Sequence, residues 1–182
     1  MKVVDNFLPS IEFDMLQQTL LSQNFDWYFN DGVVGPSDDQ YQFVHQFYKQ
    51  TTQDDIGGPT SKYANIFIPV LGTLRSTGLV RIKANLNPKT PEHVYGGFHT
   101  DFESDHASTA VYYINTNNGW TEFEDGTKVE SVENRMVIFD CHMKHTGVTC
   151  TDEKRRVVVN FNYYSTWSDP NGEMPEGYRR YI

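Results

Sequence analysis

Apolar and polar side chains alternate along much of the chain from residue 79 onward, as they do in strands that bury one face. The alternation is most regular at residues 79–87. One face of this predicted strand carries Val80, Ile82, Ala84 and Leu86, and the other carries Arg81, Lys83, Asn85 and Asn87. The polar face meets either solvent or a wet cavity, and the pattern is compatible with both.

Shorter apolar or aromatic runs, separated by residues typical of turns, predict further strands. We expect them at 3–7, 25–29, 43–48, 108–115, 120–123, 127–129, 136–140 and 155–164. Asn117-Asn118-Gly119 and Asp125-Gly126 supply tight turns between neighbouring strands. The chain is therefore expected to be rich in β-structure.

Two helices are predicted before the longer strands. The first begins at Pro9-Ser10, and apolar residues recur in it at helical spacing: Ile11, Met15, Leu16 and Leu20. The second covers 61–76, where Pro69 should kink or interrupt it. Helices followed by many short strands predict an α+β fold with a double-stranded β-helix core, jelly-roll or cupin-like, and two flanking N-terminal helices. We expect one domain, residues 1–182.

Composition narrows the classes of function. Fifteen basic against twenty-four acidic side chains give a net charge of -9, which argues against nucleic acid as the main partner. The first residues lack the apolar core of a signal peptide, and no apolar run has the length of a membrane span. We therefore expect a cytoplasmic protein with no membrane partner. Cys141 and Cys150 are interpreted as buried free thiols rather than as a disulfide or metal ligands.

Metal-ligand chemistry is suggested by residues 95–101 and by a second stretch from residue 145. His99 and Asp101 are two positions apart, so in an extended backbone they project to the same side. One imidazole and one carboxylate, joined by a second histidine, form the facial triad that holds non-haem Fe(II). His145 is our candidate for the third ligand, and His142 competes with it.

The last strand separates two neighbouring arginines by their faces. Arg156 shares a face with Val158, Asn160 and Asn162, whereas the opposite face is apolar and belongs to the core. Arg156 is therefore expected to line a polar cavity, and Arg155 to lie in solvent at the strand edge. A guanidinium matches a carboxylate with two parallel hydrogen bonds, so Arg156 is suited to hold the far end of a dicarboxylate.

These residues together resemble the Fe(II)- and 2-oxoglutarate-dependent dioxygenases, most of all the prolyl 4-hydroxylase-like branch and its small phage-encoded members. The resemblance rests on His99-Thr100-Asp101, on His145 forty-four positions after Asp101, and on Arg156 eleven positions after His145. The stretches 110–115 and 3–9 also resemble that branch. The similarity thus spans nearly the whole chain.

The resemblance implies that His99, Asp101 and His145 are the metal and catalytic residues and that Arg156 binds 2-oxoglutarate. Tyr113 matches the position whose hydroxyl assists that arginine; the other interpretation is a buried tyrosine bonded to backbone. Fe(II), 2-oxoglutarate and O2 are the implied cofactors and co-substrates, with ascorbate as a candidate reductant. The implied activity hydroxylates a substrate C–H bond while 2-oxoglutarate is decarboxylated to succinate. The carboxylate ligand favours hydroxylation over halogenation.

Other interpretations remain open at this point. The substrate is a peptidyl residue such as proline, a free amino acid or a small metabolite. From a different class, the rival hypothesis is a non-catalytic jelly-roll binding protein or a virion-associated structural protein. A cupin-like metalloenzyme that does not use 2-oxoglutarate is a third. His45 is interpreted as structural or surface, and His93 and His106 as loop residues.

Overall fold

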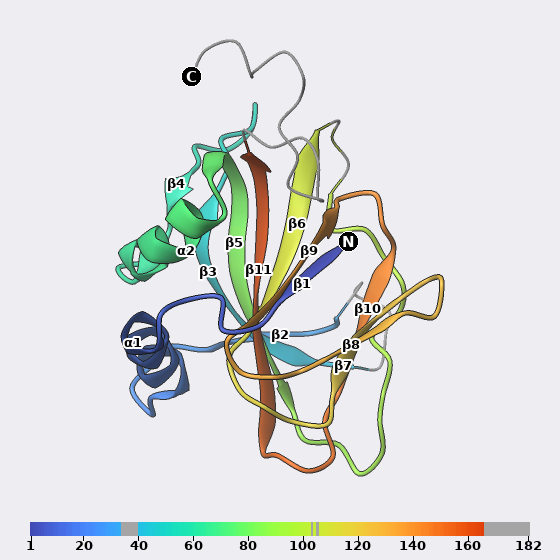
Figure 1. Cartoon of the computed structure of the whole chain (residues 1–182). Coiled ribbons are helices and arrows are strands. Elements are labelled where there is room, and N and C mark those ends of the chain that lie inside the picture. The colour runs from blue at the N-terminus through green and yellow to red at the C-terminus, as the bar shows by residue number, and fades with distance from the viewer. Residues whose placement is uncertain (34–39, 103, 105, 166–182) are drawn as a thin grey trace.

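A computed structural model describes residues 1–33, 40–102, 104 and 106–165 of the chain. Its main feature is a large antiparallel sheet whose strands run in the spatial order β1-β9-β6-β11-β5-β3-β2, with β4 beside β3 (Figure 1). The bounds are β1 Lys2–Val4, β9 Arg135–Asp140, β6 Ala107–Tyr113, β11 Arg155–Ser165, β5 Ser76–Pro88, β3 Gln42–Lys49, β2 Tyr28–Asn30 and β4 Gly58–Pro59.

A smaller sheet faces the large one. Its strands run in the order β10-β7-β8, with bounds β10 His145–Val148, β7 Trp120–Phe123 and β8 Lys128–Glu130. Residues 95–99 continue this sheet along the free side of β10, because Tyr95 bridges to Val148 and His99 bridges to His145. The two sheets form the double-stranded β-helix that the sequence predicts, so the predicted fold class is confirmed.

Apolar side chains fill both sides of the large sheet. One cluster lies between the two sheets and consists of Val111, Tyr113, Phe123, Val129, Val137, Phe139 and Val158. The larger cluster lies on the other side, where the helices α1 (Ser10–Leu21) and α2 (Ile68–Thr73) cover the sheet (Figure 1). Since the inter-sheet cluster fills only part of the space, the remainder is available for polar side chains.

The first helix has the predicted start but a different buried face. Its buried residues are Phe13, Leu16 and Leu20, whereas Ile11 and Met15 are 71% and 69% exposed. Leu16 and Leu20 belong to two overlapping apolar faces, one with Ile11 and Met15 and one with Phe13. The face that contains the aromatic ring of Phe13 packs on the core. Phe13 packs edge-on against Tyr112 at 5.9 Å between ring centroids. The prediction was therefore right for Leu16 and Leu20 and wrong for Ile11 and Met15.

The prediction of a second helix over 61–76 was too long. The structure has a 3₁₀ turn, η1 (Ala64–Phe67), followed by the short α2, and β5 already begins at Ser76. Of the two outcomes predicted for Pro69, an interruption is observed and a kink is not: η1 ends at Phe67 and a separate helix starts at Ile68. Pro69 occupies the first turn of α2, where its missing N–H leaves no hydrogen bond unmade. β10 has only four residues and was not predicted as a strand.

The pairing of β5 with β11 decides what the polar face of β5 meets. Arg81 lies opposite Asn162, Lys83 opposite Asn160, Asn85 opposite Val158 and Asn87 opposite Arg156. Lys83, Asn85, Asn87, Arg156 and Asn160 all line one cavity. Of the two alternatives left by the sequence, this face therefore meets a cavity.

Two further expectations can be compared with the structure. Cys141 and Cys150 are buried and free, as predicted. Within the described residues, no helix has both the length and the apolar character needed to cross a bilayer.

Candidate metal and carboxylate site

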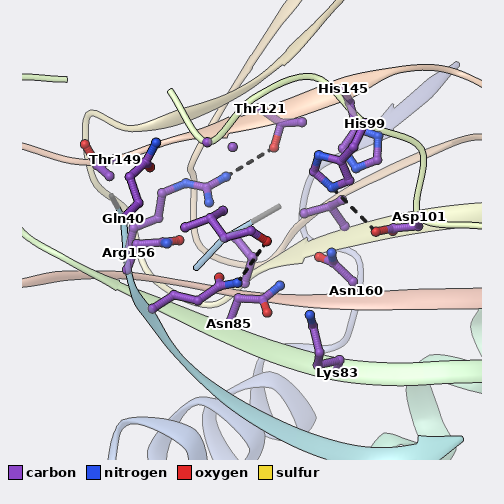
Figure 2. A pocket seen from close by; sticks show the side chains of 17 residues that line it. Gln40, Lys83, Asn85, His99, Asp101, Thr121, His145, Thr149, Arg156 and Asn160 are labelled. Carbon is purple, nitrogen blue, oxygen red and sulfur yellow. Dashed lines mark hydrogen bonds and ion pairs between the residues drawn. The ribbon is translucent and has the colours of Figure 1, made fainter. Parts of the chain in front are cut away.

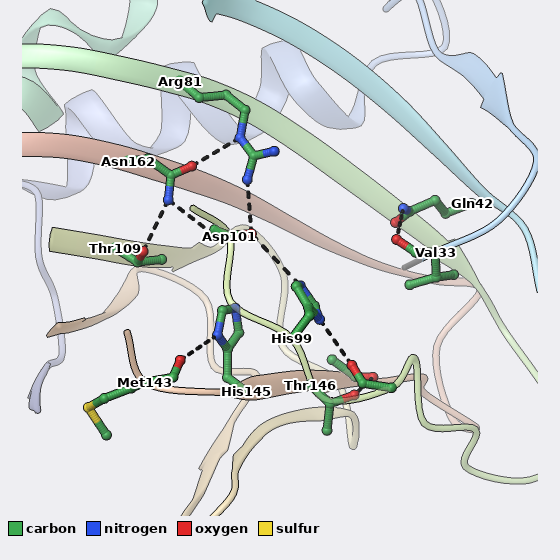
Figure 3. Close-up of polar contacts among 12 residues, drawn as sticks. Val33, Gln42, Arg81, His99, Asp101, Thr109, Met143, His145, Thr146 and Asn162 are labelled. Atoms are coloured by element: carbon green, nitrogen blue, oxygen red, sulfur yellow. Dashed lines mark hydrogen bonds and ion pairs between the residues drawn. The ribbon is translucent and has the colours of Figure 1, made fainter. Parts of the chain in front are cut away.

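His99, Asp101 and His145 converge at one end of the cavity (Figure 3). The backbones of His99 and His145 exchange two hydrogen bonds, each 3.0 Å, so their side chains leave the paired segments on the same side. The imidazole centroids lie 4.9 Å apart. One ligand atom from each of the three residues lies within 4.8 Å of the others, which is close enough for one metal ion to bind all three.

Both imidazoles present the same nitrogen to the centre of this group. Nδ1 of His145 lies 3.2 Å from the carbonyl oxygen of Met143, and Nδ1 of His99 lies 3.0 Å from that of Gly97. A carbonyl oxygen can only accept, so each Nδ1 carries the proton and donates. Each Nε2 then keeps its lone pair for a metal, as expected of a histidine ligand fixed by a backbone carbonyl.

The Asp101 carboxylate is anchored from the large sheet. Nη2 of Arg81 lies 2.9 Å from Oδ1 of Asp101, and Nδ2 of Asn162 donates to Oδ2 at 3.2 Å. Nε of Arg81 also donates to Oδ1 of Asn162 at 3.0 Å, so the two side chains hold each other as well as the carboxylate. Two neighbouring strands, β5 and β11, therefore fix one potential ligand.

Charge and burial keep two of these groups in the forms that bind a metal. Burial acts to raise the pKa of the Asp101 carboxyl, but Arg81, the imidazole of His145 and the Asn162 amide together hold that pKa below its ordinary value. Burial lowers the pKa of His145, partly opposed by Asp101. Near neutral pH the site thus offers a carboxylate and, at His145, a neutral imidazole.

Arg156 lies at the other end of the cavity, buried at 2% exposure (Figure 2). Its Nε donates to Oγ of Ser131 at 2.9 Å, and its Nη2 donates to Oγ1 of Thr121 at 3.1 Å. Among the described residues no carboxylate pairs with it, and its Nη1 has no hydrogen-bond partner. A buried guanidinium without a counter-ion is costly unless a ligand supplies the anion.

Tyr113, predicted to assist Arg156, lies beneath the guanidinium. The Cζ of Arg156 is 5.7 Å from the Tyr113 ring centroid. The Tyr113 hydroxyl donates to Oγ1 of Thr121 at 2.8 Å, the same oxygen that accepts from Arg156. Tyr113 thus contacts the arginine through its ring and through Thr121, and its hydroxyl also lies 3.3 Å from the carbonyl oxygen of Val129, which is the backbone bond of the other interpretation. Tyr113 is not among the residues that line the cavity.

The remaining predicted histidines lie elsewhere. His142 is exposed and bonded to Asp140 at 2.8 Å, away from His99 and Asp101. His45 is buried in the core, with Nδ1 at 2.6 Å from the Asp26 carbonyl and Nε2 at 2.7 Å from Oγ of Ser61. It is therefore structural.

Arg155 is not in open solvent, as the sequence interpretation expected. It is partly buried, and its Nη2 donates to the carbonyl oxygen of Leu21 at 2.7 Å. It thus ties β11 to the end of α1, on the opposite side of the sheet from the cavity. The separation of the two arginines by strand face agrees with this geometry.

Four residues of the site were missed by sequence interpretation: Arg81, Lys83, Thr121 and Ser131. The alternation in β5 places Arg81 and Lys83 on a polar face, but the partner of that face depends on strand pairing across the chain. Thr121 and Ser131 carry no signal of their own, because threonine and serine are common in strands and turns.

No protein-family model matches the sequence, and no curated protein matches it. Solved structures do match the fold. A 2OG-Fe(II) oxygenase family oxidoreductase from Burkholderia pseudomallei superposes with a TM-score of 0.67 at 12% identity, over 88% of this chain and 82% of that one. This chain has the fold of the 2OG-Fe(II) oxygenases.

Two prolyl hydroxylases share the oxygenase fold with this chain. The prolyl-4-hydroxylase of Pseudomonas putida has a TM-score of 0.54 at 14% identity, over 90% of this chain and 91% of that one. The prolyl hydroxylase of Trichoplax adhaerens, solved with a hypoxia inducible factor peptide fragment, has a TM-score of 0.57 at 14% identity, over 95% and 87%. At 14% identity these two comparisons show a shared fold and nothing more specific.

Proposed function

We propose that the protein is an Fe(II)- and 2-oxoglutarate-dependent dioxygenase that hydroxylates a C–H bond. One observation carries the proposal: a two-histidine, one-carboxylate group and a buried guanidinium without a counter-ion lie in the same cavity. The first suits a ferrous ion with open coordination positions. The second suits the distal carboxylate of a dicarboxylic acid.

The donor set fits the metal that this activity needs. His99 and His145 would supply imidazole nitrogens and Asp101 a carboxylate oxygen, a set typical of non-haem Fe(II) oxygenases. Arg81 and Asn162 hold that carboxylate in place. A binding or structural protein gains nothing from such a group facing a buried, unpaired arginine, which is why we favour the enzyme over the non-catalytic alternative.

The mechanism assigns a task to each side chain. When bound, Fe(II) and 2-oxoglutarate supply the oxidising chemistry, with O2 as oxidant and succinate and CO2 as products. Arg156 binds the distal carboxylate of 2-oxoglutarate and so aims its keto acid end toward His99, Asp101 and His145. Thr121 and Ser131 hold Arg156, which leaves Nη1 for the co-substrate.

Proline is the first substrate to assay, in peptidyl and in free form, because two structures of similar fold are prolyl hydroxylases. The presence of Asp101 supports hydroxylation rather than halogenation. A peptide, a free amino acid and a small metabolite are the substrate classes to compare.

The test uses anaerobic protein mixed with Fe(II) and 2-oxoglutarate. We expect the weak visible charge-transfer band of the chelate, and succinate release once oxygen and ascorbate are added. Peptides and amino acids are screened in parallel for a mass gain of one oxygen. Neither a band nor succinate would remove the proposal and leave a binding or structural protein. A band without succinate in every substrate mixture would favour a fold that retains the ligands without turnover.

A further inference from the structure

A second cation lines the cavity in addition to Arg156. Lys83 projects from β5 on the same face as Arg81 and Asn85 and lies opposite Asn160 of β11 (Figure 2). Its neighbour Arg81 takes the Asp101 carboxylate, and among the described residues no acidic side chain pairs with Lys83. The ammonium is partly buried, so it lacks both a counter-ion and full hydration.

Two amides beside Lys83 are also incompletely bonded. Asn85 and Asn160 are 9% and 8% exposed and line the same cavity. The Oδ1 atom of each is buried without a hydrogen-bond partner. Buried polar atoms in folded proteins are normally paired, and the exceptions call for a ligand, an ion or water. An amide oxygen can only accept, so these two atoms suit an N–H or O–H donor, whereas the unpaired ammonium of Lys83 suits an anion. Together the three groups form a second polar subsite.

The strand register separates this subsite from Arg156. Lys83 is paired with Asn160, four residues along β11 from Arg156, which is roughly 13 Å at about 3.3 Å per residue. The two carboxyl carbons of 2-oxoglutarate are roughly 5 Å apart, since four carbon–carbon bonds of about 1.5 Å join them. Arg156 is held toward the small sheet by Thr121, whereas Lys83 projects from the large sheet, so we expect one molecule not to place its two carboxylates on both cations.

We propose that Lys83 binds a carboxylate of the hydroxylated substrate, while the amide oxygens of Asn85 and Asn160 accept from a donor group of the same molecule. The inference rests on the proposed function, because it assumes that 2-oxoglutarate occupies the Arg156 end. The substrate is then a carboxylate-bearing molecule, such as a free amino acid, held with its anionic group near the metal. The rival source of the same chemistry is the keto acid end of 2-oxoglutarate itself.

The first measurement separates these two sources. The anaerobic chelate band is titrated with 2-oxoglutarate in the wild type and in Lys83→Met, which keeps the alkyl stem and removes the charge. We expect half-saturating concentrations within twofold of each other. A tenfold or larger increase in Lys83→Met would assign Lys83 to the co-substrate and overturn the proposal. If the wild type forms no band, the proposed function itself is wrong, and this inference falls with it.

The second measurement detects the substrate carboxylate with acetate as the probe. Protein loaded with Mn(II) and saturated with 2-oxoglutarate should broaden the ¹³C carboxyl line of acetate in a saturable way, because the bound anion lies near a paramagnetic ion. We expect at least tenfold weaker acetate binding in Lys83→Met and no change in Lys2→Met, an exposed lysine on β1. Equal broadening in Lys83→Met, or none in the wild type, contradicts the proposal.

A comparison in the wild type alone protects the test against a variant that fails to fold. Acetamide has the shape of acetate without its charge. We expect acetate to be broadened at concentrations at least tenfold lower than acetamide. Equal behaviour of the two probes would show that the subsite does not select a carboxylate.

Discussion

Asp101 is the residue on which most contacts of the site converge. His99, Asp101 and His145 could bind one metal ion, and Asp101 is the one carboxylate of that group. Its side chain is 5% exposed. Arg81 and Asn162 leave it little freedom to rotate away. The two oxygens of a carboxylate carry about four lone pairs, so Asp101 can accept from Arg81 and Asn162 and still have a lone pair for a metal ion.

Asp101→Ala should abolish iron-dependent turnover and weaken Fe(II) binding by more than about 100-fold. Loss of an outer hydrogen-bond partner of a metal ligand already costs 10- to 100-fold, so loss of a ligand costs more. Anaerobic equilibrium dialysis of Fe(II) measures the effect. His142→Ala is the matched control, because His142 is exposed and lies with Asp140 outside the site. Full activity in Asp101→Ala would refute the ligand assignment.

Arg156→Ala should weaken the binding free energy of 2-oxoglutarate by about 2 to 4 kcal/mol, because the distal carboxylate of the ligand loses the buried cation that pairs with it. The half-saturating 2-oxoglutarate concentration for the chelate band reports this. Arg155→Ala is the control and should leave that concentration nearly unchanged, since Arg155 bonds Leu21 on the opposite side of the sheet. The reverse ranking would show that β11 has been assigned the wrong phase.

At the scale of elements, the site depends on the polar faces of β5 and β11 and on close packing from the small sheet. A Cβ atom on Gly119 would lie 2.7 Å from the carbonyl oxygen of Val148 and 2.8 Å from Cδ of Arg156. Both distances are too short for carbon, so the turn before β7 needs glycine for Arg156 to lie where it does.

Gly119→Ala should lower the free energy of unfolding by about 1 to 3 kcal/mol and weaken 2-oxoglutarate binding, because the added methyl group displaces either backbone or Arg156. Urea unfolding and the chelate titration measure the two effects. Gly72→Ala in α2 has nothing within 4 Å of the new atom and serves as the control, with stability unchanged or raised. An unaffected Gly119→Ala would mean that this packing does not position Arg156.

Most of the correct sequence predictions came from the alternation of apolar and polar residues along the strands. It placed Arg156 in a polar cavity and Arg155 elsewhere, and it identified the polar face of β5, because a strand's two faces follow directly from residue order. It could not show that Arg81 meets Asp101, since that contact needs β5 and β11 to pair across some eighty residues. The buried face of α1 was missed because two apolar faces compete within one helix.

At the scale of the whole molecule, charge is distributed unevenly. The chain has a net charge of -9, yet the cavity is lined by two cations, Lys83 and Arg156, and by one carboxylate, Asp101, which Arg81 already pairs. An acidic protein with a cationic cavity attracts small dianions to the cavity while its surface repels large polyanions. Such cations lower the stability of the empty protein, because they are desolvated without full pairing.

Lys83→Met should therefore stabilise the metal-free protein near pH 7.5, and its advantage should shrink as the pH rises. Burial, with a further contribution from Arg81, lowers the pKa of Lys83 from its ordinary 10.5, and Asp101 opposes this in part. The folded wild type thus releases its proton at lower pH than the unfolded chain. Its stability relative to the variant rises between the lowered pKa and 10.5. Urea unfolding at pH 7.5 and pH 10 tests the sign, and a widening advantage would contradict it.

The most direct test of the account is a crystal structure of the protein with Mn(II) and 2-oxoglutarate, with the metal located by its anomalous scattering. We predict the ion within bonding distance of Nε2 of His99, Nε2 of His145 and the Asp101 carboxylate, and the distal carboxylate of 2-oxoglutarate at Nη1 of Arg156. Metal bound at Asp140 and His142, or 2-oxoglutarate away from Arg156, would contradict the account.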